Sequence, residues 1–224
     1  MFATIAGRYD LLNHLLSGNI DKRWRRLLAN SLLATLSKSE ARILDVACGT
    51  GDLSLTLFES GQARIVGVDF CRPMLAIANS KASRSGTIIP FVEGDALDLP
   101  FGDRSFEAVT IAFGLRNLTS VETGFMELLR VLKPGGKVAV LEFSKPTTPI
   151  LRSLFRIYFT KLLPLFGGLV SGSKSAYEYL PDSVSRFPDQ EALAAMMKAA
   201  GFAEVSYKNL TGGIAALHIG TRPG

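Results

Sequence analysis

The chain has 224 residues, enough for one α/β domain with a substantial buried core. A formal net charge of +5 permits contact with anionic surfaces, but no nucleic-acid-binding motif accompanies it, so we expect no nucleic-acid partner. The two cysteines, Cys48 and Cys71, have neither metal-ligand nor disulfide spacing, which predicts no metal site and a reducing compartment, the cytoplasm. No run of about 20 uncharged apolar residues and no signal-peptide pattern is present, so a membrane-spanning helix is not expected.

The N-terminal part predicts two helices separated by a break at residues 17–19, the second running to about Leu36. Basic residues surround Trp24 in the second helix. Two interpretations of this basic run remain open: a solvated helix face, or a patch on a membrane surface, where tryptophan and basic side chains are favoured.

Residues 42–53 predict a buried strand, a glycine turn and a helix start. The apolar run before the turn is typical of a parallel strand buried on both faces. Gly49 and Gly51 allow a sharp turn and a close backbone approach to a ligand. Asp52 then begins a helix, where a carboxylate suits the positive end of the helix dipole.

A second acid supports a nucleotide site. Residues 64–69 predict the next strand, which ends in Asp69, placed about 20 residues after the turn to accept hydrogen bonds from ribose hydroxyls. The rival is a nicotinamide dehydrogenase, but its third glycine is replaced by Ser54, and Asp52 would repel a pyrophosphate. A ligand with ribose and a cationic centre, S-adenosylmethionine, fits better.

The remaining chain alternates strands and helices, which predicts an α/β fold: a mostly parallel sheet with helices on both faces and a C-terminal antiparallel hairpin. Pro134-Gly135-Gly136 is expected to form a turn that opens the fifth strand. Strands are expected at 42–47, 64–69, 87–92, 106–113 and 136–143, and hairpin strands at 202–209 and 213–221. Helices are expected at 52–60, 72–83, 121–131 and 189–200.

Residues 149–180 do not fit this alternation, because they are apolar, aromatic and basic at once. The basic residues are too closely spaced for a membrane span. The stretch is either a core helix or an apolar lid that admits a lipid tail and rests on a bilayer.

Several motifs resemble the ubiquinone/menaquinone biosynthesis C-methyltransferases, a family of class I methyltransferases, over essentially the whole chain. They are Tyr9-Asp10-x-x-Asn13 near the start, Phe113-Gly114-Leu115-Arg116-Asn117 after the fourth strand, Leu141-Glu142-Phe143-Ser144-Lys145-Pro146 in and after the fifth, and Ala176-Tyr177-x-Tyr179-Leu180. The resemblance implies methyl transfer from S-adenosylmethionine to a ring carbon of a prenylated quinol, with demethylmenaquinol preferred. The ubiquinone-pathway benzoquinol, demethylphylloquinol and an acceptor outside quinone synthesis remain alternatives.

The resemblance also implies roles for residues. Arg116, with Asn117 and Tyr9, is the candidate catalytic group, because a cation that stabilises a phenolate makes the neighbouring ring carbon nucleophilic. Asn13 and Tyr177 are candidates for the acceptor site. His14 is more plausible as a helix-surface residue than as a base. The cofactor is expected to contact Asp45, Gly49, Thr50, Gly51, Asp69, Met74, Asp95, Ala96 and Phe113.

We therefore expect one methyltransferase domain over residues 1–224, in which N-terminal helices (about 1–38) and an apolar insertion (about 149–185) cap the acceptor. Expected partners are the prenylated quinol, a membrane surface contacted peripherally from the cytoplasmic side, and a second copy in a possible homodimer. Whether Met1 is the natural start or an internal methionine of a longer chain is open.

Overall fold

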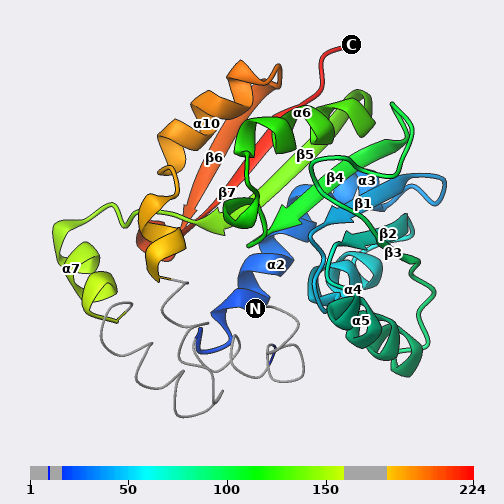
Figure 1. Ribbon diagram of the computed structural model, residues 1–224, viewed down its shortest axis with the longest axis horizontal. Coiled ribbons are helices and arrows are strands. Elements are labelled where there is room, and N and C mark those ends of the chain that lie inside the picture. The colour runs from blue at the N-terminus through cyan, green and yellow to red at the C-terminus, as the bar shows by residue number, and fades with distance from the viewer. Residues whose placement is uncertain (1–9, 11–16, 159–180) are drawn as a thin grey trace.

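A seven-stranded sheet forms the centre of the molecule, seen in a computed structural model that describes residue 10 and residues 17–158 and 181–224 (Figure 1). The strand order is β3-β2-β1-β4-β5-β7-β6. The strands are β1 (Arg42–Val46), β2 (Arg64–Asp69), β3 (Phe91–Glu93), β4 (Phe106–Ala112), β5 (Leu132–Phe143), β6 (Ala203–Leu210) and β7 (Ala215–Thr221). Strands β1 to β5 pair in parallel, whereas β7 pairs antiparallel with both β5 and β6, so the expected mostly parallel sheet with a C-terminal hairpin is confirmed.

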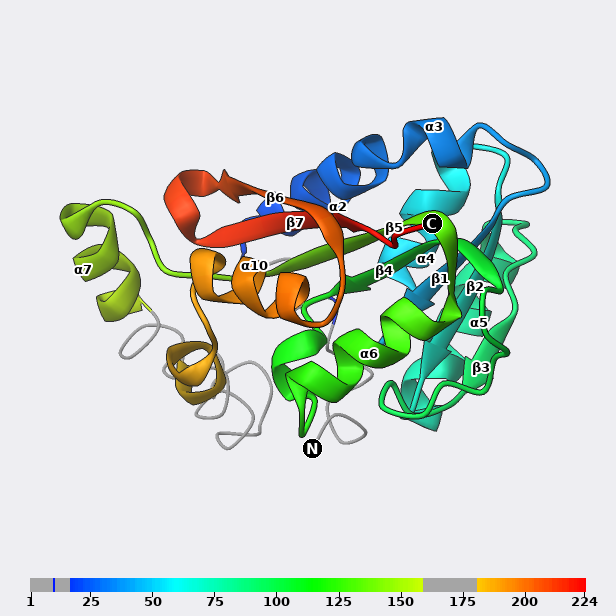
Figure 2. The same cartoon turned by 90° about the horizontal axis from the view of Figure 1, so that it is seen from above.

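Helices cover both faces of the sheet (Figure 2). One face carries α2 (Ile20–Ser31), α3 (Leu33–Leu36) and α4 (Asp52–Glu59), and the other carries α6 (Val121–Val131) and α10 (Gln190–Ala199). Side chains of β1 alternate between these two cores, Ile43 toward the first and Leu44 and Val46 toward the second. By this alternation Asp45 belongs to the face covered by α4.

Four further elements lie in the described part of the chain. Helix α5 (Arg72–Arg84) packs against β2 and β3, and the short 3₁₀ segments η1 (Leu115–Asn117) and η3 (Thr211–Gly213) follow β4 and β6. Helix α7 (Pro149–Ile157) stands away from the sheet and has no buried residue (Figure 1). The core-helix interpretation is therefore wrong for residues 149–157.

Two strand predictions need correction. Residues 87–92 were expected to form a strand, but β3 begins only at Phe91. Pro90 has no N–H to donate to a ladder, and its carbonyl accepts the Gly67 N–H just before β3 pairs with β2. The turn expected at 134–136 lies inside β5, where the ladder with β4 shifts register and the extra residues of β5 bulge out.

The basic run around Trp24 lies on α2, and the structure corrects two predictions about it. Helix α2 ends at Ser31, and α3 continues after Leu32, so the expected single helix is interrupted. The Trp24 ring is buried in the core, and its indole N–H donates to Thr211 Oγ1 at 3.1 Å. A membrane patch centred on Trp24 is wrong, because the apolar ring that such a patch needs faces the interior.

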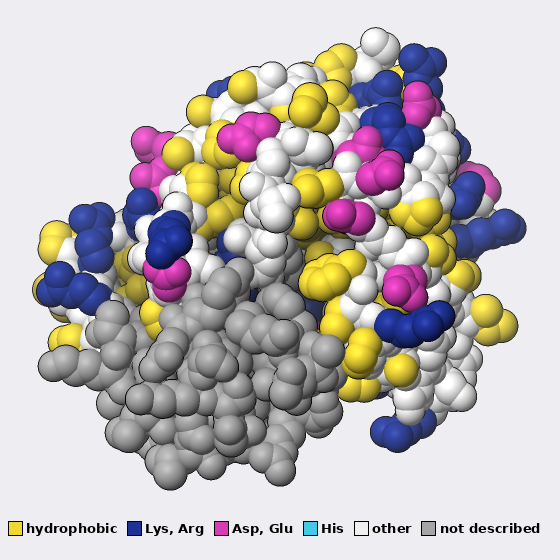
Figure 3. Space-filling model, viewed as in Figure 1, with side chains coloured by type: hydrophobic (Ala, Val, Ile, Leu, Met, Phe, Trp, Pro, Cys, Tyr) yellow, Lys and Arg dark blue, Asp and Glu magenta, His cyan; other side chains and the backbone are white. Residues whose placement is uncertain are grey.

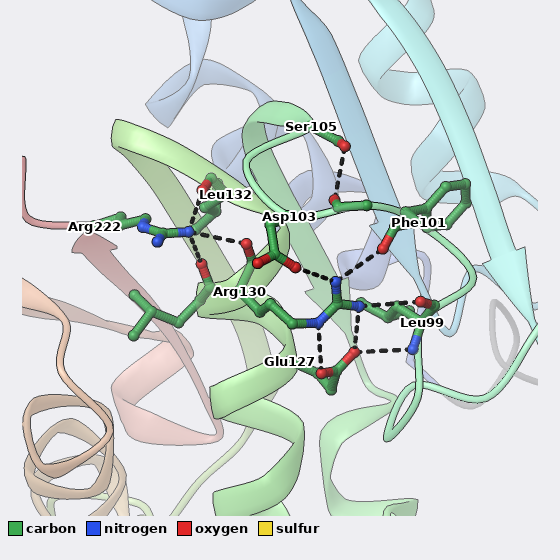
Figure 4. Close-up of polar contacts among 10 residues, drawn as sticks. Leu99, Phe101, Asp103, Ser105, Glu127, Arg130, Leu132 and Arg222 are labelled. Atoms are coloured by element: carbon green, nitrogen blue, oxygen red, sulfur yellow. Dashed lines mark hydrogen bonds and ion pairs between the residues drawn. The ribbon is translucent and has the colours of Figure 1, made fainter.

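An arginine pair anchors the edge of the sheet opposite the strands' carboxyl ends (Figure 4). Arg130, at the end of α6, pairs with Glu127 and Asp103 at 2.8 Å each and donates to the carbonyls of Leu99 and Phe101. Arg222 donates to three carbonyls at the junction of α6 and β5. Both arginines are therefore structural: Arg130 holds the loop before β4, and Arg222 satisfies carbonyls that the end of α6 leaves open.

None of the helices in the described ranges is long and apolar enough to cross a membrane. Within the same ranges, no group of three or more His, Cys, Asp or Glu side chains is arranged to hold a metal ion.

Candidate active site

The turn between β1 and α4 brings the predicted glycines to the carboxyl edge of the sheet. Gly49 and Gly51 have φ values of +55° and +82°, in the left-handed region that glycine enters without strain. Among the residues that the structure describes, a Cβ built on Gly49 would meet nothing within 4 Å, whereas one on Gly51 would meet Ala78 and Phe91 at 3.0 and 3.1 Å. With respect to these residues, the turn packs tightly at Gly51 and has space for a ligand at Gly49.

Asp69 joins the ends of β1 and β2. One carboxylate oxygen accepts the Gly49 N–H at 2.8 Å, and the other accepts the Cys71 N–H at 2.8 Å. Each oxygen has a second lone pair, which is the capacity that binding two ribose hydroxyls requires. Asp69, the carboxylate predicted to bind the ribose, therefore lies directly beside the predicted glycine turn.

Asp45 is fully buried beneath the same turn. Its oxygens accept the hydroxyls of Ser54 at 2.6 Å and Thr110 at 3.0 Å. Ser54 occupies the place of the third glycine in a dehydrogenase fingerprint, and here its hydroxyl holds the carboxylate from the first turn of α4. Asp45 therefore supports the turn from below in this structure, and direct contact with a cofactor stays a prediction.

Burial shifts the pKa values of the ionisable groups around the glycine turn. Loss of solvent raises the pKa of Asp45 to about 7, against the effect of its two hydroxyl partners, and raises the pKa of Asp69. Burial, reinforced by the two carboxylates, also raises the pKa of the Cys48 thiol well above its usual value. A positively charged ligand at this edge would favour the ionised carboxylates, which suits a sulfonium better than a phosphate.

A second turn, after β4, meets the first. Phe113 and Ala47 are both non-glycine residues with positive φ, +56° and +51°, and each directly follows the last residue of its strand. A Cβ built on Gly114 would lie 2.5 Å from the Ala47 Cβ, so the two turns are in close contact. Strained backbone of this kind persists where the surroundings enforce it and clusters at functional sites.

Arg116, the predicted catalytic residue, forms a buried ion pair with Glu142. Its Nη1 lies 2.8 Å from Glu142 Oε1 and 2.5 Å from the Phe113 carbonyl oxygen, and its backbone N–H donates to Glu142 Oε2. The side chains are 6% and 1% exposed, so the pair is nearly free of water. The buried Nε of Arg116 has no hydrogen-bond partner in the structure as described, which leaves a donor for a ligand oxygen.

Aromatic rings surround this pair. The Phe113 ring lies between Trp24 and Phe143, with centroid distances of 6.0 and 5.0 Å, and the Arg116 guanidinium sits 5.2 Å from the Phe143 centroid. The neighbouring Asn117 Nδ2 lies 3.4 Å from the Phe113 carbonyl oxygen. The fourth strand thus ends in a cation set among flat apolar rings, an arrangement that suits an aromatic ligand.

Thr50 and Asp52, on either side of Gly51, belong to a charged cluster. Asp52 pairs with Arg25 at 3.0 Å and Lys81 at 2.5 Å, and Thr50 is bonded to Lys81 and Asp10. Asp52 therefore does not by itself exclude a pyrophosphate, because Arg25 and Lys81 compensate its negative charge.

The other predicted residues lie as follows. Met74 is buried on α5, and Asp95 and Ala96 follow β3 at the same edge, with Asp95 exposed and its carboxylate accepting the Leu97 N–H. Tyr9, Asn13, His14 and Tyr177 lie outside the described residues.

Sequence reasoning missed Glu142, Thr110 and Lys81. Glu142 and Thr110 each interrupt an apolar strand, and an acid or hydroxyl inside such a run is a signal for a buried, partnered polar group. Lys81 has no comparable signal, because a lysine on a helix is usually a solvated charge.

Solved structures share the fold at low sequence identity. The [4+2]-cyclase SpnF matches with a TM-score of 0.66 and 21% identity, covering 89% of this chain and 80% of that one. Phosphoethanolamine N-methyltransferase 2 of Haemonchus contortus, solved with S-adenosyl-L-methionine, matches with a TM-score of 0.64 and 16% identity, covering 87% and 53%. These likenesses show the fold alone; that the chain is a class I S-adenosylmethionine-dependent methyltransferase rests on the family and the relatives that follow.

Sequence comparison gives the family. The ubiE/COQ5 methyltransferase family matches residues 1–222, and the chain belongs to it. Demethylmenaquinone methyltransferase of Thermus thermophilus is 54% identical over 224 residues, covering 100% of both chains. A ubiquinone/menaquinone biosynthesis C-methyltransferase, UbiE of Geobacter sp., is 45% identical over 226 residues, covering 99% of this chain and 94% of its own.

Proposed function

We propose that the protein methylates a ring carbon of a prenylated quinol, with demethylmenaquinol as the acceptor. The observation that carries the proposal is the 54% identity, over the full length of both chains, to a relative named demethylmenaquinone methyltransferase. The aromatic surroundings of Arg116 support it independently, because a quinol is a flat ring whose reactivity depends on the charge of its oxygen.

The cofactor is proposed to bind along the carboxyl edge of β1, β2 and β3. When bound, S-adenosylmethionine supplies a methyl group activated by a positively charged sulfur. Asp69 accepts hydrogen bonds from the ribose, and the residues 49–51 with Asp45 support the methionine end. Met74, Asp95 and Ala96 bind the adenine, and Phe113 faces the reacting centre.

Arg116 is proposed to stabilise the quinol oxygen as it loses its proton. Arginine keeps its charge in proteins, so this role is easier to support than proton abstraction. A buried N–H without a partner costs about 1–3 kcal/mol, and an acceptor oxygen at Nε would remove that cost. Asn117 positions the same oxygen, while Tyr9, Asn13 and Tyr177 close the acceptor site.

The experiment that tests this function is transfer of labelled methyl from S-adenosylmethionine to reduced demethylmenaquinone and, in parallel, to the demethylated benzoquinol. Arg116→Met alone would leave Glu142 buried and unpaired, so the informative variant is Arg116→Met/Glu142→Gln. We expect this neutral pair to bind S-adenosylhomocysteine normally and to lose about 100-fold or more in kcat. Arg84→Met, an exposed arginine at the end of α5, is the matched control.

The outcomes separate the alternatives. Product from the naphthoquinol alone supports the proposal, whereas product from both acceptors replaces it with a dual-pathway enzyme. No product from either, with cofactor binding intact, overturns the quinol acceptor and favours another small molecule. Full activity of the double variant would overturn the role of Arg116.

We propose, further, that residues of about 1–38 and 149–185 cap the acceptor and that α7 contacts the bilayer in which a prenylated quinol resides. Ile150, Leu154 and Ile157 recur on one face of α7 and are 77%, 59% and 47% exposed, whereas Arg152 and Arg156 lie on the opposite face. Figure 3 shows yellow apolar and dark blue basic side chains together on this projecting lobe. A helix with one apolar face and one basic face suits the surface of an anionic membrane.

Flotation with vesicles tests this contact. The protein is expected to bind vesicles rich in phosphatidylglycerol and to bind pure phosphatidylcholine weakly, and Ile150→Ser/Leu154→Ser is expected to reduce binding at least about tenfold. Met126→Ser, which removes an exposed apolar residue on α6, is the control. Unchanged vesicle binding of the α7 variant would contradict the proposal, and loss of a dimer in sedimentation would assign α7 to a homodimer interface instead.

A further inference from the structure

A chain of charged and hydroxyl groups connects the cofactor turn to residues that precede α2. Lys81, on α5, is its centre: the Nζ lies 2.6 Å from Asp10 Oδ2, 2.5 Å from Asp52 Oδ1 and 3.1 Å from Thr50 Oγ1. An ammonium group has three hydrogens, so these partners use its full donor capacity. Segments at residues 10, 50–52 and 81 thus meet at one nitrogen atom.

Thr50 strengthens the connection from within the turn. Its side chain is buried, and its hydroxyl donates to Asp10 Oδ1 at 2.5 Å while it accepts from Lys81. The Asp10 carboxylate is therefore held by two groups, one of which belongs to the turn itself. Any displacement of Thr50 changes the position that Asp10 can occupy.

The same cluster extends into α2. Asp52 Oδ2 accepts from Arg25 at 3.0 Å, Arg25 pairs with Asp21 one helical turn earlier, and Asp21 accepts the Ser17 hydroxyl at 2.6 Å. The side chains of Lys81, Asp10 and Asp52 are only 22–26% exposed, so solvent screens these contacts less than it screens surface pairs.

We propose that Lys81 is a positioning residue that couples occupancy of the cofactor turn to the position of Asp10. A ligand bound at residues 49–51 restrains Thr50, and Thr50 and Lys81 together transmit that restraint to Asp10. Cofactor binding thereby restrains Asp10, whose carboxylate both groups hold. The inference depends on the cofactor and not on the identity of the acceptor.

Hydrogen–deuterium exchange of the peptide containing Asp10, with and without saturating S-adenosylhomocysteine, tests the coupling. In the unaltered protein, the ligand is expected to slow exchange by about fivefold or more. Lys81→Met keeps the aliphatic stem and removes the charge, and it is expected to bring this ratio close to one at saturating ligand. Thr50→Val, which removes only the hydroxyl, is expected to act in the same direction, and Lys38→Met, an exposed lysine after α3, is the control.

Two results would overturn the inference: exchange in the unaltered protein that does not respond to the ligand, or a response that survives in both variants. If Lys81→Met prevents folding, the exchange ratio of Thr50→Val alone tests the coupling. The exchange experiment contains no quinol, so it can be interpreted even if the methyl-transfer assay with demethylmenaquinol is negative. The coupling and the proposed acceptor are therefore tested separately.

Discussion

At the scale of single residues, two buried acids at the same sheet edge are stabilised in different ways. Glu142 faces a full positive charge on Arg116, whereas the oxygens of Asp45 accept hydroxyl groups from Ser54 and Thr110. A buried ion pair gains attraction but loses hydration at both groups, whereas the hydroxyl hydrogen bonds to Asp45 offset only part of the cost of burying its charge. The two acids should therefore respond differently to mutation and to pH.

The Arg116–Glu142 pair should show strong coupling in a double-mutant cycle. Each of Arg116→Met and Glu142→Gln leaves the other charge buried and uncompensated, so each is expected to lower the free energy of unfolding by about 3–5 kcal/mol. The double variant is expected to lose less than the sum of the two, by about 2 kcal/mol or more. Urea unfolding of the four proteins measures this, and additivity within about 0.5 kcal/mol would contradict it.

Asp45 should make the protein less stable as pH rises toward neutrality. Its folded pKa of about 7 exceeds the ordinary value of 3.8, so the folded state binds the proton more tightly than the unfolded state. The stability contributed by its protonated form is complete below pH 3.8 and is lost as pH rises to about 7. Asp45→Asn is therefore expected to gain stability relative to the unaltered protein across this window, on the order of 4 kcal/mol.

Thermal unfolding at several pH values checks this, with Asp98→Asn, an exposed acid, as the control. The comparison between variants is essential because His218 acts in the opposite sense. Burial lowers the pKa of His218, so its contribution to stability is lost as pH falls below its ordinary value of 6.5. A difference between Asp45→Asn and the unaltered protein that stays constant with pH would refute the assignment.

At the scale of elements, the site depends on the contact between the turns after β1 and β4. Both turns contain a non-glycine residue with positive φ, and Gly114 is the position that allows them to approach. Since β1 and β4 are neighbours in the sheet, a small separation of their turns moves Arg116 relative to residues 49–51.

Gly114→Ala should push the two turns apart. The added methyl group would lie 2.5 Å from the Ala47 Cβ, and we expect a loss of about 1–3 kcal/mol in stability together with weaker binding of S-adenosylhomocysteine. Gly102→Ala is the matched control, because in the described part of the chain its Cβ would meet only Ser105 Oγ, at 3.7 Å. Calorimetric titration and thermal unfolding measure both effects, and equal behaviour of the two variants would show that the close contact is unimportant.

At the scale of the whole molecule, long-range contacts join the two ends of the chain. The Trp24 indole on α2 donates to Thr211, 187 residues away, and its ring packs against Phe113 from the middle of the sheet. The antiparallel β7 pairs with β5, so the C-terminal strand completes the same sheet that begins at β1.

This interlocking predicts a single cooperative unfolding transition for the described core. Trp24 is the only tryptophan, so its fluorescence reports on α2, whereas far-ultraviolet circular dichroism reports on all helices and strands. The two signals are expected to give the same urea midpoint, and Thr211→Val is expected to shift both midpoints together. Separate midpoints would mean that α2 unfolds independently of the sheet.

The alternation of strands and helices, the glycine turn and the position of Asp69 and Arg116 at one sheet edge could all be predicted from the amino-acid sequence. These features follow from local periodicity and from the rule that the carboxyl ends of parallel strands share an edge, so Asp69 beside Gly49 was predictable. The residue at which β3 begins was harder to predict. The apolar β-branched run before Pro90 predicts a strand whether or not Pro90 interrupts its pairing.

The pairing of the charges and the buried face of α2 became visible only in the folded molecule. Glu142 meets Arg116 across 26 residues, and Trp24 meets Thr211 across 187, and neither partner can be inferred from spacing. Arg25 and Lys81 have the sequence pattern of solvated helix charges, yet they compensate Asp52 beside the cofactor turn. The physical reason is that local patterns specify the conformation of a segment, whereas the pairing of polar groups depends on how the segments pack together.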